Sequence, residues 1–256
     1  HIREAFKAFA SQVSGTVIVR HGLDITPEDT KANIVTYGYG EADADFYAEP
    51  LEDGHFNLHY PGGVIGDCVV GVPGWVNIEN GTAAAAIALT YGIAPEKIKA
   101  ALATFTGVKR RFDIQLKSER CMYIDDYAHH PREISASLTS IRGNFPDYKL
   151  TAIFQPHLYT RTRDFAEGFA ESLSNVDRLI LLDIYPAREE PIPGVTSEII
   201  FKGVTAPEKI LLKKEELMDY MKGLELGEKE VFVTVGAGDI DRFVEPIAEL
   251  LNEKVL

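Results

Sequence analysis

The sequence predicts an α/β protein whose second part folds as a doubly wound, mostly parallel β-sheet. From residue 131 onward, helical patterns alternate with short apolar runs, and strands that alternate with helices are typical of parallel sheets. Residues 1–106 differ, because short β-rich runs divided by Gly, Pro and Asp come first and two helices follow. We therefore expect two domains, residues 1–106 and 107–256.

The first part is expected to begin with an amphipathic helix over residues 1–10. Four β-rich runs follow, and they cover Gly15 to Arg20, Asn33 to Tyr37, Asp45 to Ala48 and His55 to Tyr60. A helix is predicted over residues 77–91, where four consecutive alanines permit close packing. Pro95 suits the first turn of a second helix, which is expected to end near residue 105.

The second part is expected to begin with a charged hairpin over residues 111–123. The predicted helices then cover residues 131–144, 160–173, 214–223 and 240–251, and the predicted strands cover residues 150–154, 178–184, 209–212 and 231–235. Pro131 fits the first position of its helix, because an N–H is not needed there. In such a sheet the carboxyl ends of the parallel strands share one edge, where ligands bind.

Composition excludes several classes of protein. The formal net charge is −13 and no basic stripe is present, which argues against nucleic-acid binding. Cys68 and Cys121 lack metal-ligand spacing and are expected to be reduced core thiols. No apolar run is long enough to span a bilayer and no targeting segment is visible, so we expect a cytoplasmic protein that does not bind membranes.

The segment from Phe154 to Asp164 places four polar side chains directly after a predicted buried strand: His157, Tyr159, Arg161 and Arg163. Imidazole and guanidinium groups at a ligand-binding edge suit an anionic substrate, because a guanidinium offers two fixed donors to a carboxylate or phosphate. Considered alone, the segment can also be a solvated helix start whose arginines pair with local acids.

Residues 123–131 have the same design, because a short apolar strand ends in acids, a tyrosine and histidines. The two loops would lie side by side if their strands are neighbours. Considered alone, Asp125 and Asp126 can cap the next helix, and His129 and His130 can pack or be solvated. Zinc binding by these histidines is not expected, because successive residues point in different directions and no third ligand stands at a recognisable spacing.

Two further groups of residues have a structural interpretation. Lys109, Arg110 and Arg111 follow a predicted helix, where cations complement the helix dipole by a few tenths to about one kcal/mol. Asn77 and Asn80 open the alanine-rich helix, and one of them can be its N-cap.

The last strand is followed by Gly236-Ala-Gly-Asp239. Two glycines at this position allow a ligand to approach the backbone closely. A tight strand-to-helix turn with Asp239 as the N-cap is an equal alternative.

Six blocks of sequence, in the same order, resemble the Mur ligases. They are Gly107-Val-Lys-Arg-Arg-Phe112, Asp125-Asp-Tyr-Ala-His-His-Pro131, Phe154-Gln-Pro-His-Leu-Tyr-Thr-Arg-Thr162, Asp183-Ile-Tyr-Pro-Ala187, Glu189-Glu-Pro-Ile-Pro-Gly194 and Gly236-Ala-Gly-Asp-Ile240. The resemblance covers nearly the whole chain. It is strongest to the members that attach L-alanine to UDP-N-acetylmuramate, whereas members that add later amino acids or recycle the tripeptide resemble it less well at residues 157–162.

The resemblance implies that residues 1–106 are the later part of the central ATPase domain and residues 107–256 are the Rossmann-like C-terminal domain. The sequence contains no G-x-x-x-x-G-K-[ST] phosphate loop and no G-x-G-x-x-G after a strand, and it begins without Met. In the family a Gly-Lys-Thr phosphate loop precedes this region. We therefore expect a carboxy-terminal fragment that is inactive on its own.

Roles around ATP also follow from the resemblance. It implies that Asn77 and Asn80 contact adenine and that Asp126 accepts hydrogen bonds from the ribose. It further implies that Arg111, rather than Arg110, reaches the γ-phosphate when the domains close and stabilises the transferring phosphoryl group. ATP and Mg²⁺ are the implied cofactors, with the Mg²⁺ ligands expected mostly outside this chain.

For the other substrates, the resemblance implies that four residues surround the muramoyl lactyl carboxylate and L-alanine: His129, His157, Tyr159 and Arg161. His129 and Arg111 are the implied catalytic residues, and no protein metal ligand is assigned. Val76 and Leu158 depart from the family pattern, which usually has His and often Arg at these positions. The implied reaction is amide formation through an acyl phosphate, in peptidoglycan synthesis. A tripeptide-recycling ligase and a non-catalytic nucleotide-binding module are the alternatives.

Overall fold

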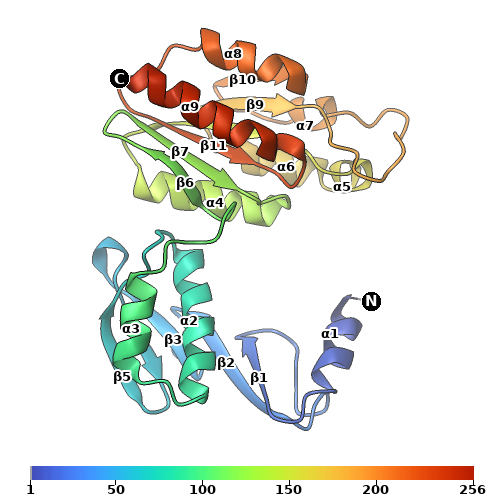
Figure 1. Ribbon diagram of the computed structural model, residues 1–256. Helices are drawn as coiled ribbons and strands as arrows, with labels where there is room; N and C mark the ends of the chain where they lie inside the picture. Colours follow the sequence, from blue (N-terminus) through green and yellow to red (C-terminus); the bar gives the residue numbers. More distant parts are fainter. Residues whose placement is uncertain (1) are drawn as a thin grey trace. The chain divides into compact units, whose positions relative to one another are not determined.

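The computed structural model describes residues 2–256, which form two compact units, each with its own sheet (Figure 1). The first unit ends at Thr106 and the second spans Gly107–Leu256. Within residues 2–256, no helix combines the length and apolar character that crossing a membrane requires. The predicted α/β class is confirmed.

The first unit contains a five-stranded sheet in the order β1-β2-β3-β4-β5. Its elements are α1 (Ile2–Ala10), β1 (Thr16–Arg20), β2 (Asn33–Tyr39), β3 (Phe46–Pro50), η1 (Glu52–Gly54), β4 (Phe56–Tyr60), β5 (Gly63–Cys68), α2 (Trp75–Thr90) and α3 (Pro95–Ala103). Strands β1, β2 and β3 are parallel to one another, β4 is antiparallel to β3, and β5 is antiparallel to β4. Strand β5 was not predicted, because Gly63, Gly66 and Asp67 weaken its sequence signal.

Helices α2 and α3 cover this sheet with small and branched side chains. Ala85 and Ala86 are 1% and 0% exposed, so the alanine run does provide the close packing that the sequence suggests. The buried cluster joins strands and helices, and consists of Ala48, Phe56, Leu58, Ile65, Cys68, Ile78, Ala85, Ile98 and Leu102.

The second unit contains a six-stranded sheet in the order β10-β9-β8-β11-β7-β6. Its strands are β6 (Asp113–Lys117), β7 (Cys121–Asp126), β8 (Lys149–Phe154), β9 (Arg178–Leu182), β10 (Glu208–Leu212) and β11 (Glu230–Val235). Its helices are α4 (Pro131–Asn144), α5 (Tyr159–Asp164), α6 (Ala166–Leu173), α7 (Glu198–Phe201), η2 (Lys214–Glu216), α8 (Leu217–Gly223), η3 (Asp239–Phe243) and α9 (Val244–Val255). Only the edge strand β6 is antiparallel to its neighbour.

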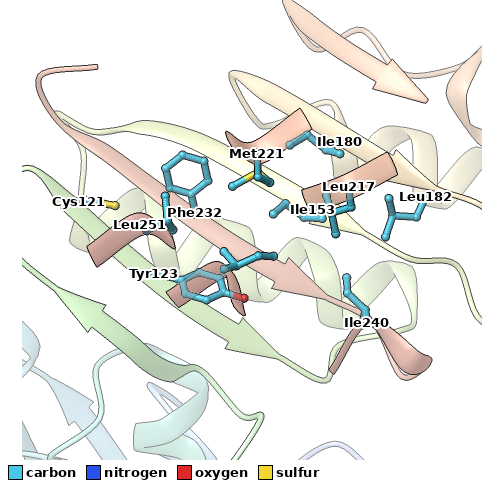
Figure 2. Packing of buried hydrophobic residues seen from close by; sticks show 11 residues of the cluster. Cys121, Tyr123, Ile153, Ile180, Leu182, Leu217, Met221, Phe232, Ile240 and Leu251 are labelled. Atoms are coloured by element: carbon cyan, nitrogen blue, oxygen red, sulfur yellow. The ribbon is translucent and has the colours of Figure 1, made fainter. Parts of the chain in front are cut away.

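Helices cover both faces of this sheet, and four central strands are buried along their whole length apart from Lys149. On the face of α8 and α9, a core of aliphatic and aromatic side chains is fully buried (Figure 2). Phe154 points to the other face, where its ring lies 5.4 Å from that of Phe169 in α6. Burial on both faces is the reason that these strands are nearly continuous apolar runs.

Several predicted boundaries differ from the structure. The single helix expected over residues 160–173 is divided at Phe165, which leaves helical geometry and packs edge-to-face on His130 at 4.8 Å. The helices expected from Lys214 and Ile240 instead begin with the 3₁₀ turns η2 and η3. Helix α7 has only four residues and was not predicted.

Candidate active site

The carboxyl ends of the five parallel strands lie along one edge of the second sheet, and the loops beyond them form the candidate site. Strand β11 separates β7 from β8, so the condition that these two strands are neighbours is not met. The loops nevertheless meet, because the His129 and His157 rings are 6.5 Å apart. Convergence depends on a shared edge rather than on adjacent strands.

His157 is held between a cation and an aromatic ring. Arg161 donates from Nη1 to His157 Nδ1 at 3.4 Å, and the imidazole stacks on Tyr185 with ring centroids 5.7 Å apart. Because Nδ1 accepts, the neutral ring carries its proton on Nε2. Burial lowers the pKa of His157, and the nearby Arg161 and His129 lower it further. His157 is therefore a neutral hydrogen-bond donor at neutral pH.

His129 has the opposite hydrogen-bonding character. Its Nδ1 lies 2.9 Å from the Tyr127 carbonyl oxygen, which only accepts, so Nδ1 carries the proton. The remaining nitrogen, Nε2, is an acceptor in the neutral ring. Glu133 fixes the backbone here, because its Oε2 accepts from the amides of His129 and His130 at 3.0 and 3.2 Å. The two imidazoles thus differ at Nδ1, which accepts a hydrogen bond in His157 and donates one in His129.

The cap of α4 is His130, whose Nδ1 accepts from the Arg132 amide at 3.3 Å. The alternative in which Asp125 or Asp126 caps the helix is therefore wrong. Asp126 accepts instead from the Ala128 amide at 3.0 Å and from Ser137 Oγ at 2.7 Å.

Burial raises the pKa of both Asp125 and Asp126. Each Asp126 oxygen accepts one hydrogen bond within the fold, and the residue is 8% exposed. A ribose hydroxyl would therefore use the second lone pair of an oxygen already engaged. The role of Asp126 in binding ribose stays a prediction.

Arg110 and Arg111 have different environments. Arg110 donates from Nε to Asp125 at 3.1 Å and from Nη2 to the Gly236 carbonyl at 2.7 Å. Arg111 is exposed, lies 5.3 Å from the Tyr127 ring centroid and has no ion-pair partner among residues 2–256. Helix α3 ends at Ala103, so the two arginines do not directly follow a helix end, as the dipole interpretation assumed. Only Arg111 has a guanidinium free to bind a ligand.

The two arginines of α5 also differ in whether they form an ion pair. Arg163 pairs with Asp164 at 2.8 Å on the surface, which is the local pairing considered for this segment. Arg161 contacts His157 and has no acidic partner in the part of the chain that the structure describes. Tyr159 is the first residue of α5 and is half-buried.

The glycines after β11 serve the fold itself. A Cβ on Gly236, whose φ is +143°, would lie 2.7 Å from the Gln155 carbonyl oxygen, and one on Gly238 would overlap Gln155 and Tyr185. Close backbone approach to a ligand is thus not the reason for either glycine. Asp239 does not cap the following turn, because Gly238 holds that position and Asp239 accepts from Gln155 at 2.8 Å and from Lys214 at 2.6 Å.

Sequence patterns did not reveal Lys214, Gln155, Tyr185 or Glu189 as parts of this edge. Although burial opposes the effect, hydrogen bonds from Lys214 and Gln155 lower the pKa of Asp239. Tyr185 and Glu189 belong to blocks that match the Mur ligases, which was the available signal. Their contacts with residues 155–160 could not be inferred from spacing.

In the first unit, α2 begins at Trp75 after Gly74, so neither Asn77 nor Asn80 is its N-cap. Asn77 Nδ2 donates to the Pro73 carbonyl at 2.8 Å, and Asn80 is exposed. Across residues 2–256, no three His, Cys, Asp or Glu side chains lie together in a way that could hold a metal ion. These residues therefore do not fit a protein-bound Mg²⁺ site.

Residues 110–238 match the family model described as Mur ligase, glutamate ligase domain. The UDP-N-acetylmuramate–L-alanine ligase of Parabacteroides distasonis is 50% identical over 99% of this chain and 55% of its own length. The ligase of the same name from Porphyromonas gingivalis is 42% identical over 98% of this chain and 56% of its own length. The chain thus spans about half the length of the curated relatives it matches.

Solved structures show the same fold. The UDP-N-acetylmuramate-alanine ligase of Thermotoga maritima matches with a TM-score of 0.76 at 25% identity, over 98% of this chain and 54% of that chain. A murein peptide ligase of Psychrobacter arcticus matches with a TM-score of 0.65 at 19% identity, over 98% of this chain and 54% of that chain.

Proposed function

The chain belongs to the Mur ligase family, and we propose that it serves the ATP-dependent joining of L-alanine to UDP-N-acetylmuramate, a cytoplasmic step of peptidoglycan precursor synthesis. On this proposal the first unit is the later part of the ATP-binding domain and the second is the C-terminal domain. The observation that carries the proposal is the carboxyl edge of the second sheet. There His129, His157 and Arg161 lie together, and Arg161, which has no acidic partner within residues 2–256, suits the carboxylate of an amino acid.

The proposed reaction has two steps. A carboxylate oxygen of UDP-N-acetylmuramate attacks the γ-phosphorus of ATP, which gives an acyl phosphate and ADP. The neutral amine of alanine then attacks the acyl carbon, and the C–O bond to phosphate breaks as the amide forms. When bound, Mg²⁺ would offset the charge between the phosphates and the carboxylate. None of its ligands is assigned to this chain.

His129 and His157 have hydrogen-bonding states that suit different parts of this reaction. The free Nε2 of His129 can accept a proton from the alanine ammonium group, which makes the amine nucleophilic. The Nε2–H of His157 can donate to a carboxylate or acyl oxygen. Tyr159 is the first residue of helix α5, and Arg161 lies in its first turn. Arg161 would bind a substrate carboxylate through charge-assisted hydrogen bonds.

Four residues are proposed to bind ATP. Arg111 is free to stabilise the transferring phosphoryl group, whereas Arg110 is occupied by Asp125. Asn77 and Asn80 lie three residues apart on α2, so their carboxamides share one side of the helix and are proposed to bind adenine. Asp126 is proposed to bind the ribose, with no change to its internal hydrogen bonds.

Phosphate release by the full-length gene product tests the proposal. Alanine should stimulate release in the presence of UDP-N-acetylmuramate and ATP. Arg161→Ala should weaken binding of alanine by about 1.5 to 3 kcal/mol, seen as a higher KM, because a charge-assisted contact is lost. Arg163→Ala is the control and should have little effect, since Arg163 pairs with Asp164 on the surface.

The other outcomes identify the alternatives. A requirement for the tripeptide in place of alanine would identify a recycling ligase. Absence of any amino-acid-dependent release would favour a non-catalytic nucleotide-binding module. Equal, wild-type KM values for alanine in both arginine variants would contradict an anion site at α5.

A further inference from the structure

Helix α5 carries Arg161 but has little that stabilises it locally. It has only six residues, and isolated helices of that length do not form in water. Leu158 stands at its N-cap with φ of 71°, a left-handed conformation, and provides no side-chain cap. The first turn of α5 therefore depends on contacts from elsewhere in the chain.

Glu189 provides those contacts from the loop between β9 and α7. Its Oε2 accepts from the Thr160 amide at 3.0 Å, and its Oε1 accepts from Thr160 Oγ1 at 2.5 Å. Hydrogen bonds from Thr160 and the Tyr159 amide lower the pKa of Glu189, so the carboxylate is ionised at neutral pH. An anion at a helix amino terminus also interacts favourably with the helix dipole.

The backbone around Glu189 is fixed to the same site. Tyr185 donates its amide to the Pro156 carbonyl at 2.8 Å, and the Leu158 amide donates to the Tyr185 carbonyl at 3.0 Å. The Tyr185 ring stacks on His157, and the Glu189 amide donates to the Pro186 carbonyl at 2.9 Å. These contacts hold the backbone before Glu189 against residues 156–158. From this position the Glu189 carboxylate reaches the first turn of α5.

We infer that Glu189 is a positioning residue for the reaction, which acts through Thr160 to set the orientation of Arg161. Arg161 directly follows Thr160, so rotation of the first turn would carry its guanidinium away from His157. This inference rests on the proposed function.

Kinetics of the full-length gene product test this role. Glu189→Ala should raise the KM for alanine about tenfold and leave the KM for ATP unchanged, because only the α5 side of the site is loosened. Glu189→Gln should recover part of the loss, since the amide oxygen still accepts from Thr160. Glu190→Ala is the matched control, because the neighbouring Glu190 is exposed and makes no hydrogen bond or ion pair within the described chain.

A double variant tests whether Glu189 acts through Thr160. Thr160→Val removes the hydroxyl that donates to the carboxylate, so adding it to Glu189→Ala should change the KM for alanine less than twofold. A larger, additive change would overturn the inference. So would a Glu189→Ala enzyme with the wild-type KM for alanine, or one in which the KM for ATP rises equally.

Amide hydrogen exchange over residues 158–164 in the same proteins separates this inference from the proposed function. Exchange should be faster in Glu189→Ala than in Glu190→Ala, because the Thr160 amide loses its acceptor. A wild-type protein without alanine-dependent phosphate release would refute the proposed function alone. Equal exchange in both variants would refute the role of Glu189, whatever reaction is catalysed.

Discussion

Charged side chains are paired to different extents at the two edges of the second sheet, because the carboxyl edge holds the Arg110–Asp125 and Lys214–Asp239 pairs together with two arginines that are not paired within residues 2–256. At the amino edge, the strands contribute Lys149, Arg178, Glu208 and Glu230, and each charge is paired at 2.7 Å. Arg178 joins Glu208 to Glu230, so three strands are held by one guanidinium. Glu230 is 1% exposed and also accepts from Thr151 at 2.7 Å.

The carboxyl edge differs in two of its arginines. Arg111 and Arg161 have no acidic partner within residues 2–256, although Glu189 and Asp126 lie near by. Each of those acids is engaged by hydrogen bonds from the backbone and from a hydroxyl. The difference teaches that paired charge in this sheet holds strands together, whereas unpaired charge marks the edge that can bind an anion.

The sharpest test of this contrast is Glu230→Ala at the amino edge. Its removal leaves the buried Arg178 with only the half-exposed Glu208, and should lower the free energy of unfolding by about 3 to 5 kcal/mol. Urea denaturation measures the change. Glu208→Ala is the control and should cost about 1 kcal/mol or less, because that carboxylate is largely solvated. Equal losses would contradict a special role for burial.

A second test compares the adjacent Arg110 and Arg111. Arg110→Met leaves Asp125 buried without its cation and should lower the free energy of unfolding by about 2 kcal/mol. Arg111→Met should leave stability within about 0.5 kcal/mol of wild type. In the full-length gene product it should slow alanine-dependent phosphate release about a hundredfold. Loss of stability in both variants would show that Arg111 is structural as well.

Local sequence patterns predicted most elements and the convergence of the loops that form the candidate site. Apolar runs that end at Asp126 and Phe154 indicated buried strands, and parallel topology then placed His129 and His157 at one edge. The order of the strands was not predictable, because periodicity does not say that β11 inserts between β7 and β8. The contact of Glu189 with Thr160 was also not predictable, since it joins a loop residue to helix α5 across 29 residues of sequence.

Glycine patterns were misleading for a related reason. Gly236 and Gly238 suggested a ligand near the backbone, but the space is filled by Gln155 and Tyr185. A glycine-rich turn indicates that something approaches closely, and only the folded chain shows that the neighbour is protein. Pairing of Arg110 likewise depends on Asp125, whose distance from it is set by the β6–β7 pairing.

The smallest expected effect concerns the proton on His157. Burial, then Arg161 and His129, lower the pKa of this imidazole below its ordinary value of 6.5. The folded chain therefore binds this proton less readily than the unfolded chain. The resulting contribution to stability is fully present above pH 6.5 and is lost as the pH falls through the folded-state pKa.

Arg161→Ala should raise the pKa of His157 back toward its ordinary value, because the nearest cation is removed. Arg163→Ala should leave it unchanged, since the exposed Arg163 guanidinium is paired with Asp164. An NMR titration of the imidazole resonances in the three proteins measures both shifts. If Arg161→Ala leaves the pKa of His157 where it is in the wild type, the field of an unpaired arginine does not reach this histidine. The contrast between the two edges would then rest on burial alone.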